Sequence, residues 1–401
     1  MSSSEELNNQ KAEKFCWLFA TLNTEAISNF KSLDRAEIQS LLEIIRLNRL
    51  ENRFLDFLKK NNLSYYLKEE ELKNLRKTSE NRSLKSLVLF DKANQISKVL
   101  LRGNIRHVFL KGLNFASDYE ELKIRPIRDI DVLIDPEDIE KAINILLDEG
   151  YSLKNKYHSS NLKIYADTKK YNIQMFDSHG ALIEIHYRIL IDKKNLQCEL
   201  SKHFLDVRNY IKPFSSKSNL LFLHLIYHGT TKNYFDVGLS FIYDICCILQ
   251  KSNFSIARTK AFSEIFHLDR EVELTLDLIK KHNGKLIPRQ LGISTPGTII
   301  NTFEYLLINK PANKVVLDLL KAGEAKKNYL IRFKKIFFVS KEELLQEFQI
   351  KEEKNLIFFL YLKRWARQFR QFFPNEFLSL FDMDKKRRAN KVGEILKYLS
   401  N

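Results

Sequence analysis

The chain has 401 residues, of which 44% are hydrophobic, and this combination suits two or three folded lobes. Only 11 glycines and 7 prolines occur, so few tight turns are expected and a mostly helical chain is predicted. The formal net charge of +16 indicates either anionic partners, such as nucleotides, nucleic acid or anionic lipid, or a solvated lysine-rich surface. The four cysteines form no C-x-x-C pair, which argues against a zinc ribbon or a disulfide framework.

The sequence carries no recognisable export or membrane signal. Its first residues are polar and acidic and lack the apolar stretch of a secretory leader. No run of about 18 apolar residues occurs, so no membrane span is predicted. A cytoplasmic protein is therefore expected.

Residues 5–103 are predicted to be helical. Asp34 precedes the amphipathic stretch AEIQSLLEIIRL and is placed to cap a helix. Further along, apolar residues recur at helical spacing, and Gly103 stands where a glycine is expected after a helix end. These apolar residues are Leu84, Leu87, Val88, Ile96, Val99 and Leu100.

After residue 103 the hydrophobic pattern changes to short apolar runs separated by turn residues. One helix is predicted among these runs, capped by Asp135 and ending at Gly150. The runs themselves are predicted to be strands. They are HVFLKG (107–112), RDIDVLID (128–135), NIQMF (172–176) and ALIEIHYRI (181–189).

The sequence beyond residue 215 is helical in pattern, with helices predicted at 219–229, 241–250 and 270–284. The predicted fold class is α+β, a small mixed-sheet core flanked by N- and C-terminal helical lobes. The expected boundaries are 1–103 for the first helical lobe, 104–195 for the α/β core and 196–401 for the second helical lobe.

Asp129 and Asp131 carry the main chemical signal. They are two residues apart on a predicted strand, so both carboxylates should project from one face while Ile130 and Val132 point into the core. Two neighbouring carboxylates repel each other, and a hard cation such as Mg²⁺ would satisfy them. Acidic pairs at strand ends are also common surface features. This pair stands within an apolar strand, where unpaired charges would be costly.

Glu184 is the candidate third carboxylate, because it lies on a later strand whose apolar residues point the other way. If the two strands are neighbours, three carboxylates meet, and such a set fits a two-metal site. His186 shares the face of Glu184 and could orient a carboxylate, or it could be a hydrogen-bonded structural residue. Repulsion predicts that Asn at position 129 or 131 leaves thermal stability unchanged or raises it.

Several motifs recur together in a known family. An apolar strand ends in Lys111-Gly112, a helix follows, and Arg125-Pro126 precedes Asp129-Ile130-Asp131. In this pattern, residues 107–151 resemble the core of the family-5 nucleotidyltransferases, a branch of the DNA-polymerase-beta-like superfamily. The later Glu-Ile-His-Tyr-Arg at 184–188, the helix with His228, and Tyr243-Asp244 are similar to that family in kind. Leu113, where the wider superfamily has Ser, and Arg128, where the family tends to have a small residue, depart from the pattern.

The resemblance implies an enzyme that moves a nucleoside monophosphate from an NTP, with ATP expected, to an acceptor and releases pyrophosphate. It implies Mg²⁺ or Mn²⁺ as cofactor, held by the catalytic residues Asp129, Asp131 and Glu184. The implied nucleotide-binding residues are Lys111, Gly112, Arg125 and Arg128. The residues implied to contact the acceptor or support the site are His186, Arg188, His228 and Asp244.

Other interpretations stay open. Lys111 could be an ordinary strand-end lysine, Arg125 the partner in a structural salt bridge, and Asp244 a capped or solvated acid. The expected acceptor is a small molecule or a protein or peptide. Transfer to an RNA end is an alternative that the basic C-terminal half supports weakly, and RNA retention with steep salt dependence would favour it. An inactive nucleotide-binding or scaffold protein is another alternative.

Overall fold

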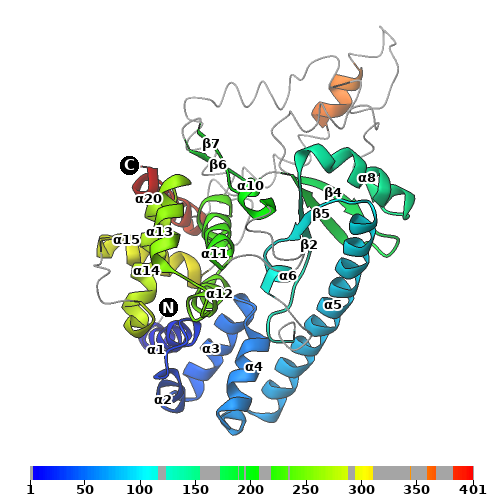
Figure 1. The fold of residues 1–401 in the computed structure, drawn as a ribbon. Helices are drawn as coiled ribbons and strands as arrows, with labels where there is room; N and C mark the ends of the chain where they lie inside the picture. Colours follow the sequence, from blue (N-terminus) through cyan, green and yellow to red (C-terminus); the bar gives the residue numbers. More distant parts are fainter. Residues whose placement is uncertain are drawn as a thin grey trace. The chain divides into compact units, whose positions relative to one another are not determined.

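The computed structural model describes residues 3–115, 123–153, 172–187, 189–193, 196–206, 218–233, 235–287, 294–309, 344, 359–366 and 383–400. The chain divides into two compact units. The first comprises Met1–Asn233 and Val237–Ile300, and the second comprises Tyr234–Asp236 and Asn301–Asn401. Figure 1 shows the helices and strands along the chain.

The N-terminal part of the first unit is helical, as predicted. Asp34 caps α3, accepting a hydrogen bond from the Glu37 backbone N–H while the Glu37 side chain accepts one from the Asp34 N–H. The first helices bury a cluster of aromatic rings, with Phe15 packed against Phe30 and Phe54. The elements are α1 (Ser3–Ala20), α2 (Ala26–Lys31), α3 (Arg35–Leu47), α4 (Glu51–Lys60), η1 (Ser64–Tyr66) and α5 (Glu69–Arg102).

The long helix α5 differs from the prediction in two details. Of its predicted apolar stripe, the C-terminal part is buried, but Leu84 and Val88 are exposed. The stripe is therefore shorter than the helix, because only the C-terminal part of α5 packs against the sheet. At the helix end, Gly103 has a φ of −77°, and the residue in the left-handed region is Asn104, with a φ of +53°.

A five-stranded mixed sheet follows, in the order β1-β2-β5-β4-β3. Only the central pair, β2 and β5, is parallel; the other neighbours are antiparallel. Asp135 caps the short turn η2 (Pro136–Asp138) that leads into α8 (Ile139–Asp148). The strands are β1 (His107–Phe109), β2 (Ile130–Ile134), β3 (Ser152–Leu153), β4 (Asn172–Phe176) and β5 (Leu182–His186), with α6 (Gly112–Phe115) after β1.

One face of the sheet is covered by α5 and α8 (Figure 1). Alternate residues of the two central strands enter this core: Ile130 and Val132 from β2, and Ile183 and Ile185 from β5. Because side chains alternate along a strand, the residues between them project from the opposite face. That opposite face carries the polar side chains of the candidate site.

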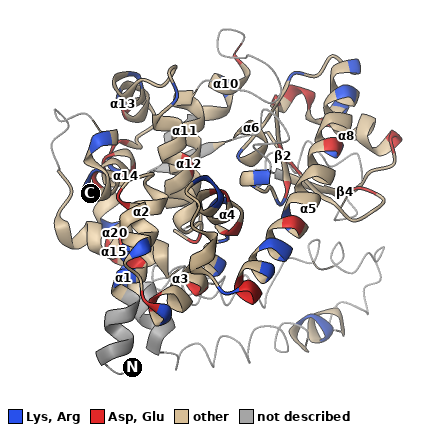
Figure 2. Ribbon diagram, turned by 90° about the horizontal axis from the view of Figure 1, so that it is seen from below, with Lys and Arg blue, Asp and Glu red and all other residues tan. Residues whose placement is uncertain are grey.

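Two helices after the sheet, α11 (Ser218–Tyr227) and α12 (Leu239–Leu249), are largely apolar. Figure 2 shows α11 and α12 almost without charged residues, whereas α5 carries both signs along its length. Within the second unit, the Lys391 ammonium group lies over the Tyr305 ring, 3.9 Å from the ring centre. The elements are β6 (Leu190–Lys193), β7 (Leu196–Glu199), α10 (Leu200–Leu205), α11 (Ser218–Tyr227), η4 (His228–Lys232), α12 (Leu239–Leu249), α13 (Ile256–Ile265), α14 (Asp269–His282), η5 (Gly284–Leu286), α15 (Gly297–Ile308) and α20 (Met383–Ser400).

The predicted fold class is confirmed: a small mixed sheet lies between helical segments that precede and follow it in the chain. The boundaries at residues 103 and 195 stay predictions, since the two compact units divide the chain at other positions. Among the described helices, none combines the length and apolar character needed to cross a membrane.

Candidate active site

Asp131 and Glu184 lie side by side on the two central strands. β2 and β5 run parallel, and in their register Asp131 is the partner of Glu184. Both side chains project from the face opposite the isoleucine-rich core. Asp131 is buried and Glu184 is half-buried. The two strands are neighbours, which is the condition under which the sequence predicted that these carboxylates would meet.

A lysine and a histidine donate to Asp131. Lys111 Nζ lies 2.6 Å from Asp131 Oδ1, and His186 Nε2 lies 2.8 Å from the same oxygen. His186 Nε2 is also 3.6 Å from Glu184 Oε2. Gln174, opposite Glu184 on β4, donates its Nε2 to Glu184 Oε1 at 2.6 Å. The two carboxylates are thus held in place by three neighbouring side chains.

Asp129 stands one residue before β2 begins, rather than within the strand as predicted. Its side chain is half-buried, and the charges of Asp131, Lys111, Arg128 and Glu184 all act on it. Asp129 therefore belongs to the same electrostatic cluster. The chain bends at this position, which frees the Asp129 carboxylate from the strict alternation of the strand.

The carboxylates differ in how readily they bind a proton. Burial would raise the pKa of Asp131, but Lys111 and His186 more than offset it, so the pKa lies well below the usual range. The hydrogen bond from His186 likewise lowers the pKa of Glu184. Burial and the charge of Asp131 instead raise the pKa of Asp129. The charged forms of Asp131 and Glu184 are therefore favoured, whereas the charged form of Asp129 is disfavoured.

Lys111 and Gly112 form a tight turn between β1 and α6. Lys111 has a φ of +50°, in the left-handed region that non-glycine residues seldom adopt, which indicates local strain. A Cβ added to Gly112 would lie 2.5 Å from both Arg125 Nη1 and Ile127 Cγ2. Position 112 therefore requires glycine, because a side chain there would displace Arg125.

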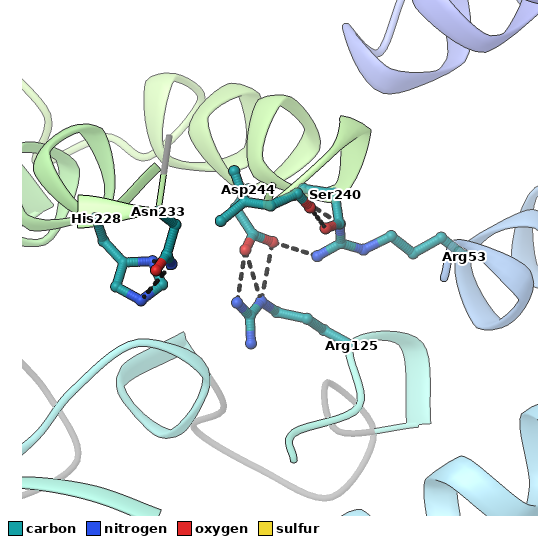
Figure 3. A network of polar contacts seen from close by, with 7 residues as sticks. Arg53, Arg125, His228, Asn233, Ser240 and Asp244 are labelled. Carbon is teal, nitrogen blue, oxygen red and sulfur yellow. Dashed lines mark hydrogen bonds and ion pairs between the residues drawn. The ribbon is translucent and has the colours of Figure 1, made fainter. Parts of the chain in front are cut away.

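Arg125 pairs with Asp244 of α12. Its Nη2 and Nε donate to the carboxylate, with Nη2 2.6 Å from Oδ2 and Nε 2.9 Å from Oδ1. Arg53 of α4 also donates to Asp244 Oδ1, and its Nη1 lies 3.1 Å from the Ser240 carbonyl oxygen. Figure 3 shows the two arginines meeting the one carboxylate. The structure thus gives Arg125 the ion pair that the sequence left as an alternative, and Asp244 is a buried partner rather than a solvated acid.

Side chains of the N-terminal helices hold the backbone around Arg125. Asn52 Nδ2 donates to the Lys123 carbonyl oxygen at 2.7 Å. Ser86 Oγ accepts a hydrogen bond from the Ile127 N–H at 2.9 Å. The segment 123–127 is therefore fastened to α4 and α5 on both sides of Arg125.

The remaining predicted residues are Arg128, His228 and Arg188. Arg128 is exposed at the segment before β2 and acts electrostatically on Asp129. Both ring nitrogens of His228 lie near Asn233 Nδ2, at 3.0 and 3.1 Å, beside the Arg125 network (Figure 3). Arg188 lies outside the described residues.

The donor set fits a divalent cation. Asp131, Glu184 and His186 each offer a ligand atom, and these atoms all lie within 4.8 Å of one another. Carboxylate oxygens are the ligands that Mg²⁺ and Mn²⁺ prefer, whereas imidazole suits softer metals. His186 donates to Asp131 in this arrangement, a contact that typically orients a metal-binding carboxylate. The carboxylates are therefore the better candidates for the ligands of Mg²⁺.

The comparisons agree with this geometry. A family described as "uncharacterised nucleotidyltransferase" matches residues 34–283. The match covers more than half of the chain and includes the sheet, the carboxylates and the Arg53–Asp244–Arg125 network. The chain therefore belongs to this nucleotidyltransferase family. Neither the curated proteins nor the solved structures gave a match to the chain.

Two contacts escaped the sequence reasoning. Gln174 supports Glu184, and its place on the polar face could be inferred from the alternation in NIQMF once the register of β4 and β5 is known. Arg53 left no such signal, since it stands in an ordinary amphipathic helix and meets Asp244 191 residues later in the chain.

Replacing Asp129 with Asn is expected to raise stability when divalent cations are chelated. The pKa of Asp129 is raised in the folded protein, so its charged form is disfavoured there. The gain from Asn should therefore appear as the pH rises through the folded pKa and vanish in acid, below the unfolded pKa of about 4. It should amount to up to about 1 kcal/mol. Urea unfolding at two pH values measures it, with exposed Asp148→Asn as control, and a loss of stability at neutral pH would contradict it.

Proposed function

We propose that this protein transfers a nucleoside monophosphate from an NTP, with ATP expected, to a small-molecule or protein or peptide acceptor and releases pyrophosphate. The observation that carries the proposal is the pairing of Asp131 and Glu184 in adjacent parallel strands, with Asp129 next to them. Membership of a nucleotidyltransferase family supports the same class of chemistry.

In this proposal Asp129, Asp131 and Glu184 hold Mg²⁺ or Mn²⁺. The metal, when bound, would offset the charge of the triphosphate and make the acceptor hydroxyl easier to deprotonate. His186 and Gln174 keep the carboxylates oriented, through the hydrogen bonds to Asp131 and Glu184.

The basic residues of the site bind the nucleotide. Lys111 lies at the tip of β1 against Asp131, where its ammonium group can also meet a phosphate. Arg125 and Arg128 add positive charge near Asp129, and Gly112 leaves room for the guanidinium group of Arg125. Arg188 and His228 stay candidates for contacts with the acceptor.

The position of a radioactive label tests the reaction class. The protein is incubated with each NTP, labelled at either the α- or the γ-phosphate, with Mg²⁺ or Mn²⁺ and candidate acceptors. Nucleotidyl transfer moves the α-label to the acceptor and releases the γ-label as pyrophosphate. Movement of the γ-label to an acceptor would instead indicate a kinase and overturn the proposal.

The same experiment separates the acceptor classes. Labelled protein would indicate a protein or peptide acceptor, and label on a small molecule would indicate a metabolite. Label on added RNA would favour the RNA-end alternative. Nucleotide binding without transfer to any of these, at every metal tested, would favour an inactive nucleotide-binding protein.

A further inference from the structure

Asp244 is the only charged residue of α12, whose sequence is LSFIYDICCIL. Its side chain is 6% exposed, and the two arginines that meet it, Arg53 and Arg125, are 5% and 22% exposed. A buried ion group of this kind seldom stabilises a protein more than well-packed apolar side chains of similar size would. Its presence in an apolar helix is better explained by the geometry it imposes on Arg125.

Arg125 is fixed on several sides. The Asp244 carboxylate accepts hydrogen bonds from Arg125 Nε and Nη2. The centre of the Phe115 ring lies 4.8 Å from the Arg125 guanidinium carbon. Its backbone neighbours are fastened to α4 and α5 through Asn52 and Ser86. A long side chain held in this way loses little further freedom when it binds a ligand, so binding is stronger than for a mobile arginine.

One nitrogen of the Arg125 guanidinium, Nη1, is not engaged by Asp244. Its Nη1 faces Gly112 and has no hydrogen-bond partner within the described part of the chain. Gly112 directly follows Lys111, whose ammonium group touches Asp131. Arg125 therefore connects Asp244 of α12 with the Lys111–Gly112 turn, which lies beside the carboxylates.

The network carries excess positive charge. Two guanidinium groups share one carboxylate, which leaves a net charge of +1 among largely buried groups, and Lys251 Nζ lies 5.5 Å from the Phe115 ring centre. Burial lowers the pKa of Arg125, but Asp244 more than offsets it and Asp129 contributes further, so the guanidinium stays charged. An anion beside Nη1 would balance this charge.

We propose that Asp244 and Arg53 are positioning residues, which hold Arg125 so that its Nη1 edge binds the triphosphate of the nucleotide beside Gly112. The inference rests on the proposed function, because the triphosphate is the substrate group concerned. Helices on both sides of the α/β core in the sequence thus build the nucleotide site, α4 through Arg53 and α12 through Asp244.

Binding of inorganic tripolyphosphate with Mg²⁺, measured by calorimetry, isolates the phosphate contacts from those to the base. Arg125→Gln and Asp244→Asn are each expected to weaken this binding at least about tenfold, the effect of losing a charged hydrogen bond. The double variant Arg125→Gln/Asp244→Asn should bind tripolyphosphate no more weakly than Arg125→Gln alone, since Asp244 acts through Arg125. Asp244→Glu, which keeps the carboxylate, should recover part of the affinity.

Matched controls come from a second buried ion pair in the same unit. Glu51 is fully buried and paired with Arg82, whereas the hydrogen bonds of Arg125 within the described residues go to Asp244. Arg82→Gln and Glu51→Gln should bind tripolyphosphate as the wild-type protein does, even where they lower stability. Should Asp244→Asn fail to fold, the double variant Arg53→Met/Asp244→Leu removes one positive and one negative charge, leaves Arg125 in place without its carboxylate partner, and should show the same loss of binding.

Three outcomes would overturn the inference. If Arg125→Gln weakens binding but folded Asp244 variants bind normally, Asp244 is structural only. If Arg125→Gln also binds normally, Arg125 is not a phosphate ligand; in both cases transfer of the α-label persists and the proposed function stands. If the wild-type protein binds neither tripolyphosphate nor any NTP with Mg²⁺, the proposed function fails as well.

Discussion

Replacing Asp131 with Asn is expected to lower the rate of nucleotidyl transfer by about 10³-fold or more, equivalent to about 4 kcal/mol in the activation barrier. Asp131 accepts hydrogen bonds from Lys111 and His186, and Glu184 is its partner on the adjacent strand. Its substitution removes the charge on which metal binding would depend. Glu184→Gln should have a large effect for the same reason, while Gln174→Ala, which removes only a supporting hydrogen bond, should lose about 10- to 100-fold.

Two quantities are measured: the rate at which an α-label is transferred, and the affinity for Mn²⁺, which is determined by electron paramagnetic resonance. Asp148→Asn is the matched control, since it makes the same chemical change at an exposed position at the end of α8. Asp131→Asn should lose both transfer and high-affinity Mn²⁺ binding. A variant that still binds Mn²⁺ and transfers label at the wild-type rate would show that Asp131 is not part of the active site.

The structure also changes the expected stability of this variant. From the sequence, repulsion between Asp129 and Asp131 suggested that either Asn substitution leaves stability unchanged or raises it. Asp131 is instead paired with Lys111 and His186, and its pKa is lowered. The lowered pKa stabilises the fold above the unfolded pKa of about 4, and this contribution is lost as the pH falls through the folded value. At neutral pH, Asp131→Asn should therefore be less stable, while Asp129→Asn keeps the original expectation.

Local sequence patterns were sufficient to predict the strands β1, β2, β4 and β5, and in β2 and β5 which residues face away from the core, but the short strands β3, β6 and β7 were not predicted. In β2 the isoleucine and valine residues mark the buried side, and in β5 Ile183 and Ile185 do the same. Because the period of a strand is two residues, Asp131 and Glu184 had to lie on the polar faces of their strands. Hence the carboxylates could be found without knowledge of the fold.

The pairing of strands and the helical contacts could not be obtained in this way. β3 and β4 intervene in the sequence between β2 and β5, so no local pattern specifies that β2 and β5 are parallel neighbours in the register Asp131–Glu184. Likewise Arg53 and Asp244 are joined only by tertiary packing. Arg125 was assigned to the nucleotide by resemblance, and only the structure shows that two of its nitrogens are already engaged by Asp244.

Replacing Asp244 with Leu is expected to destabilise the protein by about 3–5 kcal/mol, because it leaves Arg53 and Arg125 largely buried without a counter-charge. Thermal or urea unfolding should show a large drop in the transition midpoint. The triple variant Arg53→Met/Asp244→Leu/Arg125→Met removes all three charges and should recover most of the lost stability, since apolar side chains of similar volume can replace a buried ion group. A single variant as stable as the wild-type protein would mean that water reaches the two arginines.

The triple variant also separates the two roles of the network. If the buried charges served only to hold α4, α12 and the segment before β2 together, an apolar replacement that restores stability should also restore tripolyphosphate binding. Arg125, however, is the member whose Nη1 faces Gly112, and no methionine can donate a hydrogen bond to a phosphate. A stable triple variant that does not bind tripolyphosphate would therefore show that the charges serve nucleotide binding. The ion pairs of Asp244 with the two arginines would then offset the free energy that it costs to bury these charges.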